Sequence, residues 1–376
     1  MPQADLSRLP GRLRWRIRWA RIRHWEFWPG WLYYIPIVLW ILLCGLRFRH
    51  WTAFSATNPG MDNGSVVGER KSRMLLALQQ ARPDLLPRTE LLDTELDKAL
   101  ASVRQLGEEQ GWPLVLKPDI GQRGRGVAIV HSLAEAEAYL RVASFAVLAQ
   151  AYVEGQEYGI FLRRLPGRPD FEISSITHKA LPFLSGNGRD NLRTLILAHP
   201  RAWLIAPMLF DRHREQLGRV LKESEDFQLV ELGAHCRGSE FRDGSACHSP
   251  ALLQTMQALA HALPGFDFGR IDLRCPDAQS LRAGKAIQVL EINGVTSEPA
   301  HYYHPGTSYW RGLAGFCAHW TRAFALGRDN LRQQRATALP PLRLLQLFRE
   351  DLRRFPACER ASQAALEARN LHPPRG

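Results

Sequence analysis

The chain has 376 residues and 45% hydrophobic side chains, which supports folded cores and excludes wholesale disorder. Its formal charge of +12 sits at the ends: residues 1–50 hold nine Arg against two acids (+7), residues 328–376 hold ten Arg against five acids (+5), and the remainder is neutral. A folded body without excess charge argues against nucleic acid as a partner and favours a membrane surface of anionic lipids.

An apolar stretch near the N-terminus predicts a membrane anchor. Phe27 to Leu46 contains no charged residue and, as a helix, would be about 30 Å long, enough for one bilayer core. Arginines stand on both sides of it, so the positive-inside rule draws both ends to the cytoplasm, and Pro36 should break the helix near its middle. We therefore expect a bent, re-entrant or in-plane anchor on the cytoplasmic face of the inner (plasma) membrane. A cleaved signal peptide and a buried core helix are the alternatives.

Apolar periodicity and turn residues predict an α+β body after this segment. Pro113–Pro118 reads as a buried strand, 127–130 as the strand that returns from a glycine-rich loop, and Ser132 with Glu135 as a capping box that opens a helix. Antiparallel strand pairs are expected. The predicted helices are 69–81, 94–110, 133–143, 190–198, 212–222 and 249–263, and the further strands are 146–150, 156–164, 170–178, 227–231, 267–274 and 286–292.

The loop Gly121-Gln122-Arg123-Gly124-Arg125-Gly126 fits neither of two familiar phosphate-binding motifs. It lies between two strands instead of opening a helix, and its glycines have the wrong order for a dinucleotide fingerprint. The segment Gly64 to Ser72 likewise lacks P-loop spacing. What remains is a flexible glycine hairpin over phosphates, with Lys117 reaching in from the preceding strand.

Two later strands carry polar residues that alternate with apolar ones. Period-2 alternation places Arg270 and Asp272 on one face of the first strand, and Glu291 and Asn293 on one face of the second. If these strands pair, Asp272, Glu291 and Asn293 form a set of hard oxygen ligands suited to Mg²⁺. Arg270 beside them could offset phosphoryl charge. The alternative for either strand alone is an ordinary polar face.

Together these motifs resemble the ATP-grasp superfamily, in its carboxylate–amine ligase branch that includes D-alanine–D-alanine ligases and cyanophycin-synthetase-like enzymes. The resemblance covers about residues 58–312 and implies two α+β subdomains that clamp ATP. The implied domains are a basic arm and apolar anchor over 1–56, an ATP-grasp domain over 57–325 and a basic helical tail over 326–376.

The resemblance also implies roles for individual residues. Lys71, Lys117, Gly124 and Gly126 would contact ATP phosphates; Gln150, Tyr152 and Val153 would face the adenine, and Glu157 the ribose hydroxyls. Lys179, before the turn Gly186-Asn187-Gly188, would lie near the phosphates and act with Arg270 in catalysis. Asp272, Glu291 and Asn293 would hold Mg²⁺, or Mn²⁺ in its place.

The implied activity is an ADP-forming, membrane-associated ligase that activates a small-molecule or peptide carboxylate as an acyl phosphate and joins it to an amine. Two departures from the family pattern bear on the substrate. Gln150 replaces the usual Glu, and Gln122, Arg123 and Arg125 replace the serine-bearing loop of D-alanine ligases, which argues against D-alanine ligation. An ATP-grasp phosphotransferase and a non-enzymatic nucleotide-binding membrane module are the alternatives.

Overall fold

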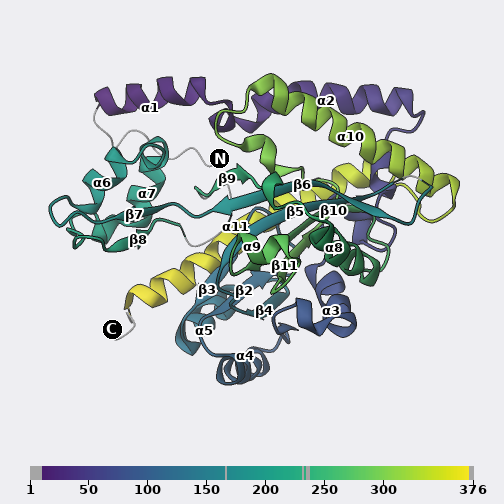
Figure 1. The fold of residues 1–376 in the computed structure, drawn as a ribbon. Helices are drawn as coiled ribbons and strands as arrows, with labels where there is room; N and C mark the ends of the chain where they lie inside the picture. The colour runs from purple at the N-terminus through teal and green to yellow at the C-terminus, as the bar shows by residue number, and fades with distance from the viewer. Residues whose placement is uncertain (1–10, 166, 231–232, 234–237, 372–376) are drawn as a thin grey trace. The chain divides into compact units, whose positions relative to one another are not determined.

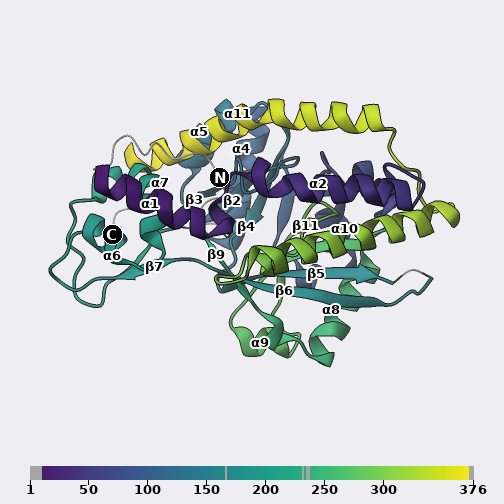
Figure 2. The same ribbon diagram turned by 90° about the horizontal axis from the view of Figure 1, so that it is seen from above.

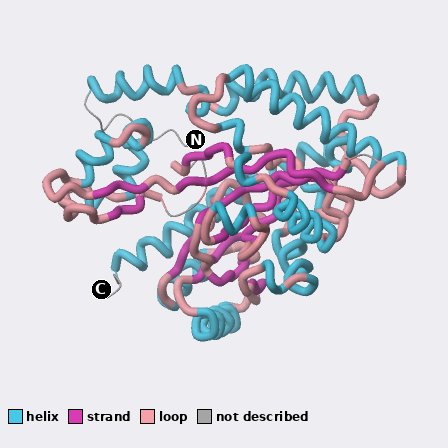
Figure 3. The backbone as a smooth tube through the Cα atoms, viewed as in Figure 1, coloured by secondary structure: helices cyan, strands magenta, loops and turns pink. Residues whose placement is uncertain are grey.

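The chain divides into two units, and the strands described below run antiparallel to their neighbours. The computed structural model describes residues 11–165, 167–230, 233 and 238–371 (Figure 1). The first unit combines the described residues of Met1–Leu39, Lys179–Arg242 and Tyr302–Gly315. The second unit combines those of Trp40–His178, Asp243–His301 and Phe316–Gly376. Figure 3 separates the helices from the strands along this backbone.

One sheet of the second unit contains the strands on either side of the glycine loop. Its order is β1-β4-β2-β3, and all neighbours are antiparallel. Helices α4 and α5 pack on it, and buried Val103, Leu116 and Tyr139 belong to one shared core. Ser132 caps α5 as predicted, since its hydroxyl accepts the N–H of Glu135 at 3.3 Å. The bounds are β1 Thr89–Leu91, α4 Leu96–Gln110, β2 Leu114–Pro118, β3 Ala128–Val130, α5 Leu133–Val142 and β4 Val147–Ala151.

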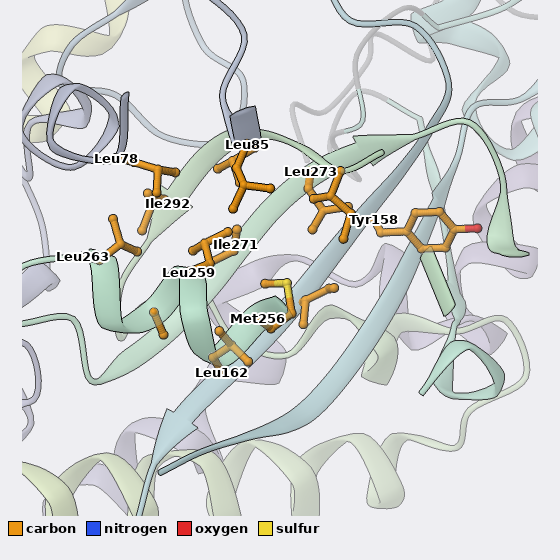
Figure 4. Close-up of a cluster of buried hydrophobic side chains, with 14 of the residues drawn as sticks. Leu78, Leu85, Tyr158, Leu162, Met256, Leu259, Leu263, Ile271, Leu273 and Ile292 are labelled. Carbon is orange, nitrogen blue, oxygen red and sulfur yellow. The ribbon is translucent and has the colours of Figure 1, made fainter. Parts of the chain in front are cut away.

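Strands β11, β10, β5 and β6 lie side by side, in that order, in a second antiparallel sheet. Leu162, Ile271 and Ile292 on its apolar face are at most 3% exposed, and Figure 4 shows them clustered with Met256 and Leu259 of α8. Because the apolar face of the sheet packs on α8, the position of its opposite, polar face is fixed as well. The bounds are α3 Lys71–Ala81, β5 Gln156–Arg164, β6 Phe171–Ala180, α8 Pro250–Ala262, β10 Phe268–Cys275, α9 Ala278–Arg282 and β11 Gln288–Asn293.

The C-terminal helix α11 (Pro341–Leu371) is built into the core of the first of these sheets. It runs along α5 (Figure 2), and its Ala361 and Ala365 are at most 2% exposed within the same apolar cluster as Val103 and Tyr139. Arg369 forms an ion pair with the buried carboxylate of Glu135 at 3.1 Å. The second half of α11 is thus a structural part of this sheet's domain.

The predicted apolar segment forms helix α2 (Gly30–Arg47), which continues through Pro36. The expected break is therefore wrong; the proline removes one backbone donor, and packing against α10 (Tyr309–Arg332) supports the helix beyond it. The Trp40 indole donates to Thr321 at 3.0 Å, and Cys44 is 2% exposed. Among the described residues, α2 is the one helix long and apolar enough to cross a membrane, by length and composition alone.

The first unit contains short helices beside a two-stranded sheet of β7 and β8. Leu192, Ile196, Leu209 and Leu221 are fully buried in its core. Trp25 stacks on Tyr303, with ring centroids 5.4 Å apart, and its indole donates to the carbonyl of Thr307. The bounds are α1 Gly11–Arg23, β7 Phe183–Ser185, α6 Leu192–Ala198, α7 Ala206–Arg212, β8 Asp226–Gln228 and β9 Glu240–Asp243.

Most predicted elements are confirmed within two or three residues, but the helix predicted over 212–222 is wrong. Helix α7 ends at Arg212, and the backbone of residues 219–221 pairs instead with the segment before α6: Leu192 N–H donates to Arg219 O, and Gly188 N–H to Leu221 O. Residue 231 of the predicted strand 227–231 lies outside the described residues. Among the described residues, the 3-10 turns are 25–27, 53–56, 62–65, 83–85, 202–205, 214–216, 245–247 and 300–303.

Candidate active site

Lys71 is the first residue of α3, and the glycine loop lies against it. Its ammonium donates to the carbonyl of Gly121 at 2.6 Å and lies 3.5 Å from a carboxylate oxygen of Glu291. Asp119 holds the start of the helix in place: its carboxylate accepts the Ser72 N–H at 2.7 Å and the Ser72 hydroxyl at 3.0 Å. A carboxylate at a helix N-terminus is favourable because it faces unpaired N–H groups. Asp119 directly follows β2 and is not among the residues predicted from the sequence.

Lys117 projects from β2 and is 5% exposed. Its ammonium donates to the Gln150 side-chain oxygen at 2.8 Å and to the carbonyl of Leu290 at 2.8 Å. Burial lowers the pKa of Lys117 to about 8, aided by nearby Lys71 and opposed by Glu291. The amide nitrogen of Gln150 donates to Thr89 Oγ1, which in turn donates to a carbonyl, so the orientation of the Gln150 amide is set from behind. The side-chain oxygen of Gln150 therefore points to Lys117 and accepts a hydrogen bond from its ammonium group.

The two polar strands pair, which is the condition on which the predicted set of oxygen ligands depends. In the antiparallel register of β10 and β11, Arg270 faces Asn293 and Asp272 faces Glu291. The Arg270 guanidinium donates to both carboxylate oxygens of Asp272, at 2.8 and 3.3 Å, and the Asn293 amide donates to Asp272 at 3.2 Å. Asp272 is 3% exposed. The structure thus brings these four predicted residues together with Lys71 and Lys117.

The segment between β4 and β5 is held by Arg274, a residue that follows Asp272 by two positions on β10 and has no predicted role. Its guanidinium donates to the carbonyl of Val153 at 2.5 Å and to Glu157 at 3.3 Å, and it lies 5.0 Å from the centre of the Tyr152 ring. Arg274 is 5% exposed and Glu157 is 8% exposed. Three of the four residues predicted to contact adenine or ribose are therefore held by one buried arginine.

The glycine loop between β2 and β3 has a left-handed backbone at three positions, Arg123, Gly124 and Gly126, with φ of 57°, 69° and 71°. Glycine adopts such angles without strain. At Gly126 a side chain is also excluded, because a Cβ there would lie 2.6 Å from Pro118. Glycine at position 126 therefore allows the loop to pass close to Pro118.

Glu69 adds a carboxyl group that sequence analysis did not single out. Its Oε2 atom is buried, with no hydrogen-bond partner among the described residues. The pKa of Glu69 is raised to about 7, mainly by burial; Lys71 opposes this shift, and Glu291 and Asp351 contribute to it. Asp351, from α11, is 5% exposed, and burial raises its pKa too.

Lys179 belongs to the first unit and is 5% exposed on β6. The turn that follows it forms as predicted: the Asn187 side-chain oxygen accepts the N–H groups of Arg189 and Asp190, and Asn191 caps α6. The assignment of Lys179 to the phosphates stays a prediction, because the other predicted site residues belong to the second unit.

The donor chemistry of the site fits a hard divalent cation. Asp272 and Glu291 contribute carboxylates from facing strands, and Mg²⁺ prefers one or two carboxylates together with phosphate oxygens. No group of three His, Cys, Asp or Glu side chains is arranged for a metal in the part of the chain that the structure describes.

No family model matches the chain. Curated cyanophycin synthetases of Trichormus variabilis and a Nostoc species are 25% identical to it over 142 residues, which is 37% of this chain and 15% of each relative. This confirms the resemblance to carboxylate–amine ligases that the motifs predict. The chain matches only a small part of each relative's length. The activity and substrates of this chain are therefore proposals.

Solved structures with similarity to the chain include three ligases. A D-Ala:D-Ser ligase of Enterococcus faecalis is 13% identical, covering 69% of this chain and 61% of its own, with a TM-score of 0.40. A D-alanine–D-alanine ligase of Bacillus anthracis is 14% identical, covering 71% and 67%, with a TM-score of 0.36. A bifunctional glutathione synthetase of Pasteurella multocida is 18% identical, covering 59% and 32%, with a TM-score of 0.32.

Proposed function

We propose that the protein is an ATP-dependent ligase that activates a carboxylate as an acyl phosphate and joins it to an amine. The convergence of two lysines with two carboxylates carries this proposal. Lys71 lies 3.5 Å from Glu291, and Lys117 donates to the carbonyl of Leu290, the residue before Glu291. Asp272 faces Glu291 in the sheet register. Four separate segments supply these groups, which suit polyphosphate and its metal ions.

The chain's own residues would bind and orient the nucleotide. Lys71, Lys117 and the glycine-loop N–H groups would take the phosphates, while Tyr152, Val153 and Glu157 would take the nucleoside. Asp272 and Glu291, with Asn293, would hold Mg²⁺, whose chemistry is to neutralise phosphate charge. Arg270 would offset charge on the transferring phosphoryl group. The bidentate contact of Arg270 with Asp272 keeps its guanidinium oriented beside the carboxylates.

The proposed reaction has two steps. A carboxylate oxygen of the substrate attacks the γ-phosphorus, the bond to the β,γ-bridging oxygen breaks, and ADP leaves with the electron pair. The amine nitrogen then attacks the acyl carbon, inorganic phosphate leaves, and the nitrogen loses a proton to give the amide. The lysines and Arg270 act by lowering the energy of developing negative charge, a contribution that can reach about 3 kcal/mol for one group.

The test combines hydroxylamine trapping with site variants. Purified protein is given MgATP, pooled amino acids, peptides and cell-wall precursors, and hydroxylamine as a surrogate amine. We expect ADP and an acyl hydroxamate, and we expect Lys117→Ala, Asp272→Ala and Glu291→Ala each to lower the rate about 10²-fold or more.

Two other results would redirect the assignment. A stable phosphorylated product without hydroxamate would indicate a phosphotransferase. Nucleotide binding without ADP release from any pool would indicate a non-enzymatic module. Full turnover in all three alanine variants would remove these residues from the site, whatever the reaction.

We further propose that the enzyme works at a membrane surface, on the cytoplasmic side. Helix α2 supports this because one face packs on α10, whereas Trp31, Leu39 and Leu46 on the other side are 56–70% exposed. Helix α1 adds arginines suited to anionic lipids and exposes Trp15 at 63%. An in-plane attachment leaves the contacts of α2 with α10 intact.

A further inference from the structure

The glycine loop has few backbone hydrogen bonds of its own to fix its shape. Within residues 121–127 the structure gives two turn hydrogen bonds, from Arg125 N–H to Gln122 O at 3.1 Å and from Val127 N–H to Gly124 O at 3.3 Å. Three positions have a positive φ, one of them the non-glycine Arg123. A short glycine-rich segment with this little internal bonding loses its order easily unless other elements hold it.

One face of helix α11 supplies contacts along this loop. The Gln122 amide donates to Asp351 at 3.4 Å, and the Arg125 guanidinium lies 4.0 Å from the centre of the Phe355 ring. Arg125 also lies 3.8 Å from the Glu359 carboxylate. Positions 351, 355 and 359 are one helical turn apart and so share a face.

Helix α11 also fits the backbone of the loop. A Cβ added at Gly126 would lie 3.0 Å from Cβ of Cys358, so helix and loop are already in close contact there. Cys358 is 2% exposed. Because Ala361, Ala365 and Arg369 anchor the following turns in the core of the same domain, α11 offers the loop a fixed support.

We propose that α11 is a positioning element of the nucleotide site: the face formed by Asp351, Phe355, Cys358 and Glu359 holds the glycine loop in its phosphate-binding conformation. This proposal rests on the proposed function for the ligand and on the contacts above for the geometry. It assigns a role to a helix that lies beyond the segment resembling ATP-grasp enzymes. A loop that is ordered in advance binds phosphate without a further entropy cost.

The experiment compares Phe355→Leu with Phe355→Tyr and Phe348→Leu. The leucine removes the aromatic face beneath Arg125, whereas tyrosine keeps it. Phe348 lies on the same helix, is 41% exposed and serves as a matched control. The first readout is amide hydrogen exchange over residues 121–127 in nucleotide-free protein. The second is the dissociation constant for MgATP, measured by calorimetry.

We expect Phe355→Leu to speed loop exchange and weaken MgATP binding about three- to tenfold, as loss of a cation–π contact and of loop order implies. Phe355→Tyr and Phe348→Leu should match the wild type. Unchanged exchange in Phe355→Leu overturns the positioning role, and faster exchange with unchanged affinity overturns its link to nucleotide. Lys117→Ala serves as a separate control for nucleotide binding. If even the wild type binds no MgATP, the proposed function fails, but the exchange result still decides whether α11 holds the loop.

Discussion

Glu69 shows how one buried carboxyl group makes stability depend on pH. Its folded pKa of about 7 lies above its ordinary value of 4.5, with burial as the main cause. A raised folded pKa means that the folded protein binds more protons than the unfolded chain between these values. The stabilisation is fully present below about pH 4.5 and is lost as the pH rises through about 7.

We therefore expect Glu69→Gln to remove part of this pH dependence. Between pH 5 and pH 8 the unfolding free energy of the wild type should fall by about 2 kcal/mol more than that of the variant. Urea unfolding at the two pH values measures the difference. Glu108→Gln, on an exposed position of α4, is the control and should behave as the wild type does. Parallel curves for Glu69→Gln and wild type would contradict a raised folded pKa of Glu69.

At this scale the sequence identifies residues whose positions follow from strand alternation. Arg270, Asp272, Glu291 and Asn293 could be grouped because side chains alternate along a strand and two such strands pair. Glu69 could not be found this way. Its pKa depends on burial and on Glu291 and Asp351, which come from other segments, and no local pattern predicts those neighbours.

The pairing of strands β5 and β10 likewise depends on long-range contacts that no local pattern predicts. Both were predicted, but their register, with Gly159 opposite Asp272, comes from tertiary pairing. It explains the glycine: a Cβ at position 159 would lie 2.8 Å from Arg270 Cδ and 2.9 Å from an Asp272 oxygen. The helix wrongly predicted over 212–222 failed for a related reason, because long-range backbone bonds override local apolar spacing.

Gly159→Ala should thus damage the site more than the fold. The added methyl group would displace Arg270 from Asp272, and we expect ADP release to fall about tenfold or more, as for loss of one electrostatic contact. The thermal midpoint should change little, since the clash can be relieved by side-chain movement. Gly218→Ala, where nothing lies within 4 Å, is the matched control. Equal turnover in both variants would show that the Arg270–Asp272 contact is dispensable.

For the whole molecule, charge and hydropathy predicted an apolar N-terminal helix but not its partner. The sequence left open a bent, re-entrant or in-plane anchor, and also a core helix. In the structure α2 packs along α10 through Trp40 and Cys44 on Thr321, and Phe48, directly after α2, stacks on Phe324. A span across the bilayer would break these contacts, whereas in-plane attachment keeps them.

The exposed face of α2 gives the membrane proposal its sharpest test. Leu39, Leu43 and Leu46 are 55–60% exposed, so changing all three to Gln leaves the packed face untouched. Wild-type protein should sediment with phosphatidylglycerol vesicles and resist high salt, because buried apolar area and not charge alone holds it. The triple variant should stay in the supernatant. The control changes Leu342, Leu345 and Leu352 to Gln on α11, which are 47–76% exposed, and should still sediment.

Each departure from this pattern has a definite meaning. Release by the α11 changes and not by the α2 changes would move the attachment to the C-terminal helix. Complete solubility of the wild type in the presence of vesicles would make α2 a helix that merely covers α10. In cells, protease access to the N-terminus from outside would establish a single span, since the arginines on both sides of α2 predict that both ends stay in the cytoplasm.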